Sequence, residues 1–224
     1  MKNTAELQQL YAAYLAEHRF EQAPSELYDP VNYIMELGGK RLRPVLTLLS
    51  YQLFGSDVEE VLPAAHAVEL FHNFSLVHDD IMDAAPLRRG RPTVHERYDQ
   101  NTAILSGDVM LIYVYDFLTR VGRPAIQPAL FRVFNRVAIE VCEGQQLDMN
   151  FERRRDVQIS EYIDMIGKKT AALIAGALEL GARAAGAAGE DVERLAAFGR
   201  HTGIAFQLQD DILDTFGDPE KFGK

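Results

Sequence analysis

The sequence has little cysteine and no excess of basic charge, and each absence removes a class of function. Only one cysteine, Cys142, occurs among 224 residues. No internal disulfide can therefore form, and we expect a reducing, cytoplasmic location. Acidic residues outnumber basic ones by 33 to 23, a formal net charge of −10, which argues against nucleic acid as a partner. An anionic substrate would need cations gathered locally at its site.

Signal-peptide, membrane and strand patterns are also missing. Residues 1–6 have no apolar run of the kind that a signal peptide carries. The most apolar segment, 171–188, contains Glu179 and Arg183 and is rich in alanine and glycine, so it predicts a buried helix and no transmembrane segment. No segment alternates between apolar and polar residues as a strand would. The length and the hydrophobic fraction of 47% predict a single domain over 1–224.

Helical periodicity dominates the chain instead. Asp29-Pro30 predicts a helix start and Gly38-Gly39 its end, while Pro44 and Pro63 predict the first turns of two more helices. A loop is predicted over 84–97, and further helices are predicted over 102–119, 124–150, 161–185 and 191–215, with Ser160 as an N-cap. We therefore predict an all-α fold, a bundle of long helices around a central cavity.

The most informative feature is an acidic five-residue pattern that occurs twice, as DDIMD at 79–83 and DDILD at 210–214. Three carboxylates in five helical residues repel one another unless a cation neutralises them. The first and fifth lie on one helix face, with the second beside them. Carboxylate oxygens suit Mg²⁺, which completes its shell with water and phosphate. We interpret the patterns as facing magnesium sites, because solvated helix ends would not follow such long apolar stretches.

Cationic residues flank the first acidic pattern. They form two runs, Lys40, Arg41 and Arg43 after Gly38-Gly39, and Arg88 with Arg89. Arginine binds phosphate bidentately, lysine acts as a point charge, and a glycine turn allows close backbone approach. His72 lies two helical turns before Asp79 on the same face. Singly these would be surface charges and a core histidine; with two acidic patterns they predict an anion pocket.

The second acidic pattern has its own polar neighbours. Gln207 stands three residues before Asp210, so it shares one helix stripe with the carboxylates. It could orient a phosphate or a metal-bound water, or be an ordinary hydrogen-bonding residue of the helix face. Lys169 and Thr170 precede the alanine-rich segment and could direct a cation and a hydroxyl toward the same pocket.

Six motifs follow one another along nearly the whole chain: GGKRLRP (38–44), HNFSLVHDDIMD (72–83), RRGRPT (88–93), GD (107–108), KT (169–170) and FQLQDDILD (206–214). In this order they resemble the trans-isoprenyl diphosphate synthases, or polyprenyl synthetases. The resemblance implies an isoprenoid-synthase helical bundle and an active homodimer. It implies a prenyltransferase that joins isopentenyl diphosphate head-to-tail to an allylic diphosphate (dimethylallyl, geranyl or farnesyl) and releases pyrophosphate.

The resemblance also implies roles for individual residues. The Mg²⁺ ligands would be Asp79, Asp83 and Asp210, assisted by Asp80, Asp211 and Asp214. Isopentenyl diphosphate would be held by Lys40, Arg43, His72 and Arg89, and the allylic diphosphate by Arg88, Lys169 and Lys224. Thr170 and Gln207 would lie beside the developing carbocation, and the catalytic set would be Asp79, Asp83, Lys169, Gln207 and Asp210.

Two other functions share part of this pattern. A terpene cyclase would have the bundle and the first acidic pattern, but a second metal site that mixes Asn, Ser and Glu. A non-catalytic subunit of a heteromeric synthase would typically lack aspartates that are complete here. In the family, Gly-Lys and further helices follow the second acidic pattern, whereas Gly223-Lys224 are the last residues here, so we expect the C-terminal helices to be missing.

Product length has one physical clue. Phe74 lies five residues before Asp79, about 7.5 Å along the same helix, and could end the space for a growing prenyl tail. Ser75 beside it is small and adds no second barrier. By resemblance, an aromatic residue there fits a geranylgeranyl product, with farnesyl as the next possibility. The alternative is that Phe74 is simply a core residue.

Overall fold

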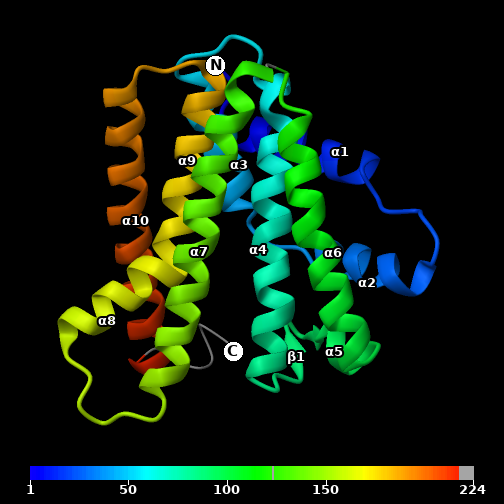
Figure 1. Ribbon diagram of the computed structural model, residues 1–224, viewed down its shortest axis with the longest axis vertical. Coiled ribbons are helices and arrows are strands. Elements are labelled where there is room, and N and C mark those ends of the chain that lie inside the picture. The colour runs from blue at the N-terminus through cyan, green and yellow to red at the C-terminus, as the bar shows by residue number, and fades with distance from the viewer. Residues whose placement is uncertain (123, 217–224) are drawn as a thin grey trace.

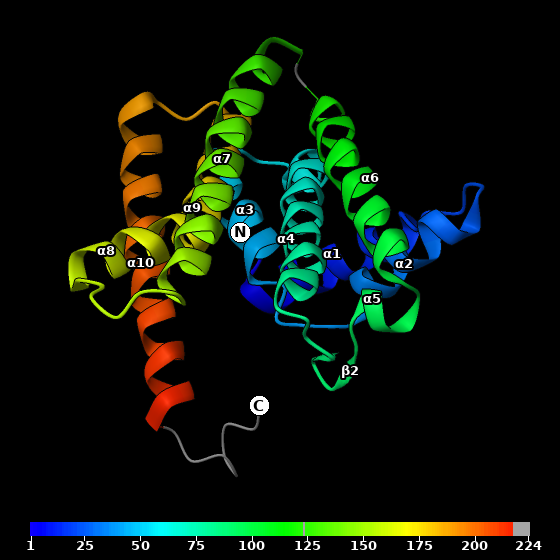
Figure 2. The same ribbon diagram turned by 60° about the horizontal axis from the view of Figure 1, so that its bottom comes forward.

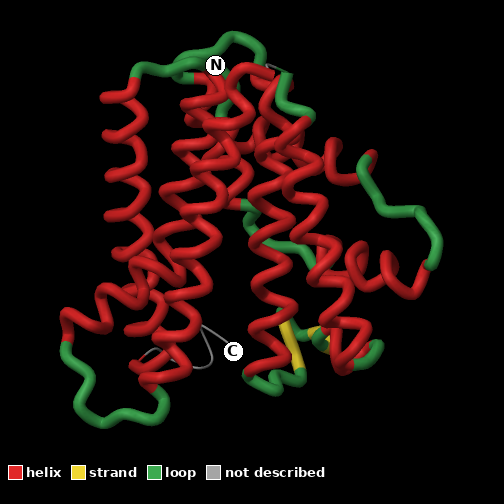
Figure 3. The backbone as a smooth tube through the Cα atoms, viewed as in Figure 1, coloured by secondary structure: helices red, strands yellow, loops and turns green. Residues whose placement is uncertain are grey.

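The computed structural model describes residues 1–122 and 124–216, which form a bundle of long helices (Figure 1). The long helices are α1 (Thr4–Glu17), α2 (Ser25–Glu36), α3 (Leu42–Gln52), α4 (Leu62–Met82), α6 (Gln100–Thr119), α7 (Gln127–Phe151), α9 (Ala172–Ala185) and α10 (Gly189–Phe216). Shorter elements are η1 (Val58–Val61), α5 (Val94–Arg97), η2 (Pro124–Ile126), α8 (Ile159–Ile166) and the π-helical η3 (Gly167–Ala171). Figure 3 shows that loops connect the helices mainly at the two ends of the bundle. The predicted all-α fold is confirmed.

The core is built around α4 and α9. Helix α4 packs against α6 on one side and α3 on the other, and α9 packs against α3, α7 and α10 (Figures 1 and 2). Large side chains such as Phe71 of α4 and Phe134 of α7 are fully buried in this core, as is Tyr11 of α1. The two acidic patterns lie near the ends of α4 and α10, so the packing of these helices places both patterns at the same end of the bundle.

Some predicted boundaries were wrong. Helix α2 begins at Ser25 and not at Asp29, and Pro30 lies inside it, so the helix lacks the backbone hydrogen bond that an N–H at position 30 would donate. The N-cap of α8 is Gln158 and not Ser160, because Glu161 accepts a hydrogen bond from the Gln158 backbone N–H at 2.9 Å. The segment 84–97, predicted to be a loop, ends in helix α5 and contains two strands of two residues each, β1 (Leu87–Arg88) and β2 (Arg91–Pro92), which pair antiparallel.

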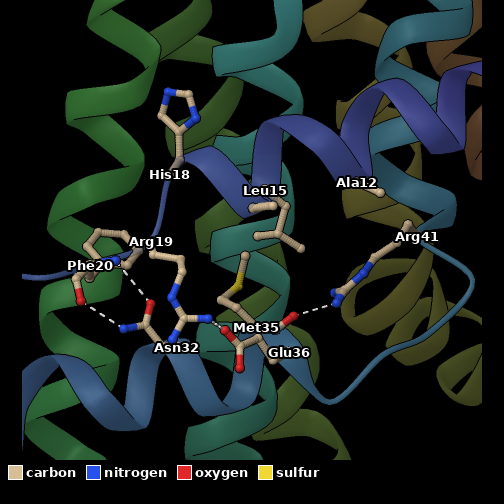
Figure 4. Close-up of a pocket in the computed structure, with 10 residues that line it drawn as sticks. Ala12, Leu15, His18, Arg19, Phe20, Asn32, Met35, Glu36 and Arg41 are labelled. Carbon is tan, nitrogen blue, oxygen red and sulfur yellow. Dashed lines mark hydrogen bonds and ion pairs between the residues drawn. The ribbon is translucent and has the colours of Figure 1, made fainter.

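A cavity of about 310 Å³ lies between α1 and α2 (Figure 4). Its polar groups are paired with one another, Arg19 with Glu36, Asn32 with the backbone of Phe20, and Arg41 with the Met35 carbonyl. The Arg41 guanidinium also contacts the buried Glu69 carboxylate at 2.6 Å. Arg41 therefore stabilises this side of the bundle, although it belongs to the predicted anion-binding run.

Candidate active site

A second, larger cavity of about 540 Å³ lies between α4, α7, α9 and α10. Its lining includes the acidic Asp79, Asp210 and Asp214, the cationic Arg43, Arg88 and Lys169, uncharged polar residues such as His72, Ser75, Thr170 and Gln207, and the apolar Phe71, Phe74, Val141, Leu173 and Phe206. Aspartates from both acidic patterns thus line one space, together with cations from three other motifs. This arrangement can hold an anion and a divalent cation beside an apolar surface.

Asp79 supplies an acceptor without a donor. Its Oδ1 is buried and accepts no hydrogen bond from the described residues, and the nearest cation, Lys169 Nζ, lies 3.7 Å away. Asp83 caps the C-terminus of α4, and burial together with the charge of Asp79 raises its pKa. Unpaired carboxylate oxygens that repel one another are a fitting environment for a hard cation such as Mg²⁺.

Asp80 points away from the cavity and has a different task. It is 1% exposed, and both of its oxygens accept from Arg88 at 2.6–2.9 Å. Burial alone would lower the pKa of Arg88, but the hydrogen bonds and charge of Asp80 outweigh it and raise that pKa. Asp80 therefore holds a permanently charged Arg88 at the cavity wall, and the structure does not bring Asp80 itself to the cavity.

Asp211 repeats this behaviour in the second pattern. Its Oδ2 accepts from the Tyr162 hydroxyl and its Oδ1 from Gln207 Nε2 at 2.8 Å. Gln207 Oε1 in turn accepts from the Thr170 hydroxyl at 2.8 Å, so a hydrogen-bonded chain links α8, η3 and α10. Asp210 and Asp214 line the cavity instead.

Metal binding by the protein alone is not indicated. Over residues 1–122 and 124–216, no three His, Cys, Asp or Glu side chains converge closely enough to hold an ion. Mg²⁺ held through one or two carboxylates and completed by water and substrate phosphate does not need such a cluster.

Arg43 carries the positive charge on one side of the cavity, and His72 lies beside it. Arg43 Nη1 donates to His72 Nε2 at 3.2 Å, and burial, reinforced by Arg43, lowers the pKa of His72 well below its usual value. The imidazole is therefore neutral and accepts a hydrogen bond from the arginine. Arg43 Nε is buried, and no atom of the described part of the chain accepts a hydrogen bond from it. A buried donor without an acceptor is costly, so this atom suits an anionic ligand.

Two predicted cations, Lys40 and Arg89, are not on the cavity wall. Lys40 is exposed, and its backbone carbonyl accepts from Gln8. Arg89 donates to the Gly38 carbonyl and so ties the loop after α4 to the glycine turn before α3. Lys224 lies outside the described residues.

The π-helical turn sets the direction of Lys169. A π-helix adds a residue to a turn and so changes which side chains share a face. Lys168 faces Glu143 and Asp164, whereas Lys169 Nζ donates to Asp148 at 2.5 Å and lies near Asp79. Burial alone would lower the pKa of Lys169, but these carboxylates raise it, so the ammonium stays charged.

Two glycines let neighbouring helices approach this turn. A Cβ at Gly144 of α7 would lie 2.2 Å from the Lys169 backbone nitrogen, and one at Gly203 of α10 would lie 2.6 Å from Ala171 Cα. The sequence interpretation missed this contact, and it also missed Asp148 and Tyr162. Asp148 could have been noticed, because it follows Gly144 by four residues and shares its helix face.

Phe74 and Ser75 both line the cavity. The Phe74 ring meets His78 edge-to-face at 4.7 Å between centroids, and Phe71 lies behind it at 5.6 Å. The Ser75 hydroxyl donates to the His72 carbonyl at 2.8 Å. The aromatic rings therefore bound the apolar part of the cavity.

Known proteins share this sequence and fold. A geranylgeranyl diphosphate synthase from Methanosarcina mazei is 45% identical over 202 residues, which cover 90% of this chain and 62% of that protein. A short chain isoprenyl diphosphate synthase from Methanocaldococcus jannaschii is 43% identical, over 89% of this chain and 61% of its own length. The crystal structure of a geranylgeranyl pyrophosphate synthase superimposes with a TM-score of 0.96 at 49% identity, covering 100% of this chain and 68% of that one.

The chain thus spans about three fifths of the length of the two curated relatives. The family model described as polyprenyl synthetase matches residues 24–224, and the motifs and cavity described above lie within that range. The chain belongs to the polyprenyl synthetase family.

Proposed function

We propose that this chain joins isopentenyl diphosphate to an allylic diphosphate, in a reaction that depends on Mg²⁺ and releases pyrophosphate. One observation carries the proposal: among the residues that the structure describes, the cavity has a buried donor without an acceptor, Arg43 Nε, and a buried acceptor without a donor, Asp79 Oδ1. A diphosphate anion and a divalent cation would satisfy both atoms.

Carboxylates on the cavity and beside it would hold the metal. Asp79 and Asp210, which line the cavity, and Asp83, which caps α4, are the proposed principal ligands, and Asp214 assists them. When bound, Mg²⁺ supplies Lewis-acid stabilisation of the negative charge on a departing diphosphate. Asp80 and Asp211 act indirectly: Asp80 orients Arg88, and Asp211 orients Gln207.

The cations would divide between two substrates. Arg43 and His72 hold isopentenyl diphosphate, with Lys40 and Arg89 near the same glycine turn. Arg88 and Lys169 hold the allylic diphosphate, and their carboxylate partners keep both charged and aimed. Fixed charges of this kind stabilise a leaving diphosphate without reorganisation.

The apolar wall protects the reacting carbon. An allylic carbocation reacts with water, so the phenyl rings and Leu173 must exclude water while Thr170 and Gln207 border the charged end. Phe74 ends the space for the tail, which favours a geranylgeranyl product, with farnesyl as the shorter candidate.

A homodimer is part of the proposal. Apolar side chains of α6 are exposed along one side, with Leu105 59% and Ile112 66% accessible, which suits an interface with a second copy. The same helix is long and apolar enough to cross a membrane by length and composition, with 39% of its apolar window buried inside the chain. Core helices of soluble proteins can have the same length and composition. We therefore propose a cytoplasmic location.

The test is an assay of the purified chain with Mg²⁺, labelled isopentenyl diphosphate and each allylic diphosphate. We expect linear prenyl diphosphates, identified by chromatography after dephosphorylation. Hydrocarbon or cyclic products from an allylic diphosphate alone would indicate a terpene cyclase. Turnover that appears only after a second, different subunit is added would indicate a non-catalytic partner.

A further inference from the structure

His78 lies between the acidic end of the cavity and its aromatic end. Phe74, His78 and Met82 follow one another at four-residue intervals on α4, and all three line the cavity. Residues at this spacing contact each other on a helix face. The rings of Phe74 and His78 meet at 4.7 Å between centroids with an interplanar angle of 63°. A tail that extends from Asp79 toward Phe74 must pass the imidazole.

The other side of the His78 ring is held by α6. Its Nε2–H donates to the Ile104 carbonyl at 3.2 Å, and Asp108 Oδ1 lies 4.0 Å from the same nitrogen. A Cβ at Gly107 would lie 2.2 Å from Nε2 and 2.6 Å from Cδ2. The imidazole therefore occupies the space that any side chain at position 107 would need, and this packing depends on glycine.

We propose that Gly107 and His78 are positioning residues for product length. The missing side chain at Gly107 gives the imidazole its place on α6, and the imidazole fixes the ring of Phe74 at the end of the apolar space. The inference deepens the proposed prenyl transfer and rests on it. It also gives the Gly-Asp motif at 107–108 a physical role that is separate from metal and diphosphate binding.

Steric displacement has a predictable direction. With a methyl group at position 107, the imidazole must leave α6, and its free side is the cavity and Phe74. Gly107→Ala should therefore shorten the apolar space, and the main product should lose at least one five-carbon unit. His78→Ala removes the support of Phe74, so the products should become longer or more mixed. In the double variant no ring is left to displace, and its products should match those of His78→Ala.

The experiment compares these three variants with the parent chain and with Gly176→Ala. A Cβ at Gly176 would lie 2.6 Å from Val137 Cγ2, a comparable crowding between two helices, but neither residue lines the cavity. Each purified chain is assayed with Mg²⁺ and both diphosphates, and the dephosphorylated products are separated by chain length. Circular dichroism and thermal melting establish that each variant is folded. Gly176→Ala should leave the product distribution unchanged.

Three outcomes would overturn the proposal: an unchanged distribution from folded Gly107→Ala, an unchanged distribution from His78→Ala, or a double variant that still makes the shortened product. If Gly107→Ala does not fold, His78→Ala alone decides. A parent chain without condensation activity would reject the proposed function instead. The ring contact is then read by proton NMR, because the His78 ring protons should lose a ring-current shift in Phe74→Ala and move in Gly107→Ala. Unmoved His78 signals would overturn the pairing itself.

Discussion

The two neighbouring aspartates of the first acidic pattern should respond in opposite ways to the same substitution. Asp79 presents an unpartnered Oδ1 to the cavity, whereas Asp80 binds Arg88 with both oxygens. Changing each to asparagine removes one charge and keeps the shape of the side chain. Asp79→Asn should therefore affect metal binding, and Asp80→Asn should affect stability.

For Asp79→Asn, metal-free stability should change by less than about 1 kcal/mol, because the variant loses repulsion from Asp83 and attraction to Lys169 at 3.7 Å together. Mg²⁺ bound together with inorganic pyrophosphate, at 100 times the dissociation constant, stabilises a folded chain by about 2.7 kcal/mol. That corresponds to a rise in Tm of roughly 5–10 °C for a chain of this size. The variant should lose most of this rise, and its turnover should fall by orders of magnitude because an amide is a poor Mg²⁺ ligand.

For Asp80→Asn, the expected pattern is reversed. The carboxylate is 1% exposed, and removing one partner of a buried ion pair costs about 3–5 kcal/mol. The metal-free Tm should fall by roughly 6–20 °C, while the rise on adding Mg²⁺ is retained. The KM for the allylic diphosphate should increase, since Arg88 is no longer held.

Both variants are measured by thermal melting with and without Mg²⁺ and inorganic pyrophosphate, alongside steady-state kinetics. The two variants must differ in metal-free stability and in the rise in Tm on adding Mg²⁺ and pyrophosphate. The assignment fails if Asp79→Asn keeps the full Mg²⁺-induced rise in Tm, or if Asp80→Asn loses that rise while its metal-free stability is unchanged.

Four further predictions concern other residues of the cavity, the proposed interface and the core. Arg43→Ala should raise the KM for isopentenyl diphosphate more than the KM for the allylic substrate in steady-state kinetics, and the reverse would exchange the two pockets. Ile112→Glu should convert a dimer into a monomer in light scattering, because this exposed side chain lies on the proposed interface; a parent chain that is monomeric at micromolar concentration contradicts the dimer. Phe74→Ala should stay folded and lengthen the products; a loss of about 3–5 kcal/mol in urea unfolding with unchanged products would make the ring a core residue only. Burial lowers the pKa of His66 to about 3, so protons bind the unfolded chain preferentially below pH about 6.5 and the free energy of unfolding falls as pH decreases toward 3. Between pH 7 and pH 5 the free energy of unfolding should fall by about 2 kcal/mol in the parent chain, and urea unfolding of His66→Gln should no longer show this fall. An equal pH dependence in the parent chain and the variant would refute the role of His66.

Local spacing was enough to predict much of the site. Long apolar stretches before each acidic pattern predicted the helices that end there, and α4 and α10 carry the patterns as expected. Charge repulsion within each pattern predicted that the aspartates would need a common neutralising partner, and Asp79 and Asp210 do line one cavity. These inferences depend on residues within one or two helical turns of each other, which sequence alone displays.

The orientation of individual carboxylates could not be predicted in this way. Helical periodicity places Asp80 and Asp83 on one face, yet Asp80 is buried and Asp83 is exposed. The helix ends at Met82, so Asp83 is its cap, and the partner that buries Asp80 comes from the following loop. Both effects depend on tertiary structure, which helical spacing alone does not display. The direction of Lys169 was equally hidden, because it depends on a π-helical turn packed against Gly144 and Gly203.

Charge compensation distinguishes the two halves of the cavity. Arg88 and Lys169 are each paired with a carboxylate, so their fields at the cavity are largely cancelled by Asp80 and Asp148. Within residues 1–122 and 124–216, Arg43 hydrogen-bonds to a neutral imidazole, and its buried Nε–H has no acceptor. Its charge is the least compensated of the three, so this half can attract a diphosphate without help. The other half faces Asp79 as well as its paired cations, and an anion there meets net repulsion until a divalent cation reverses it. The allylic substrate should therefore depend on the metal for binding as well as for departure of its diphosphate.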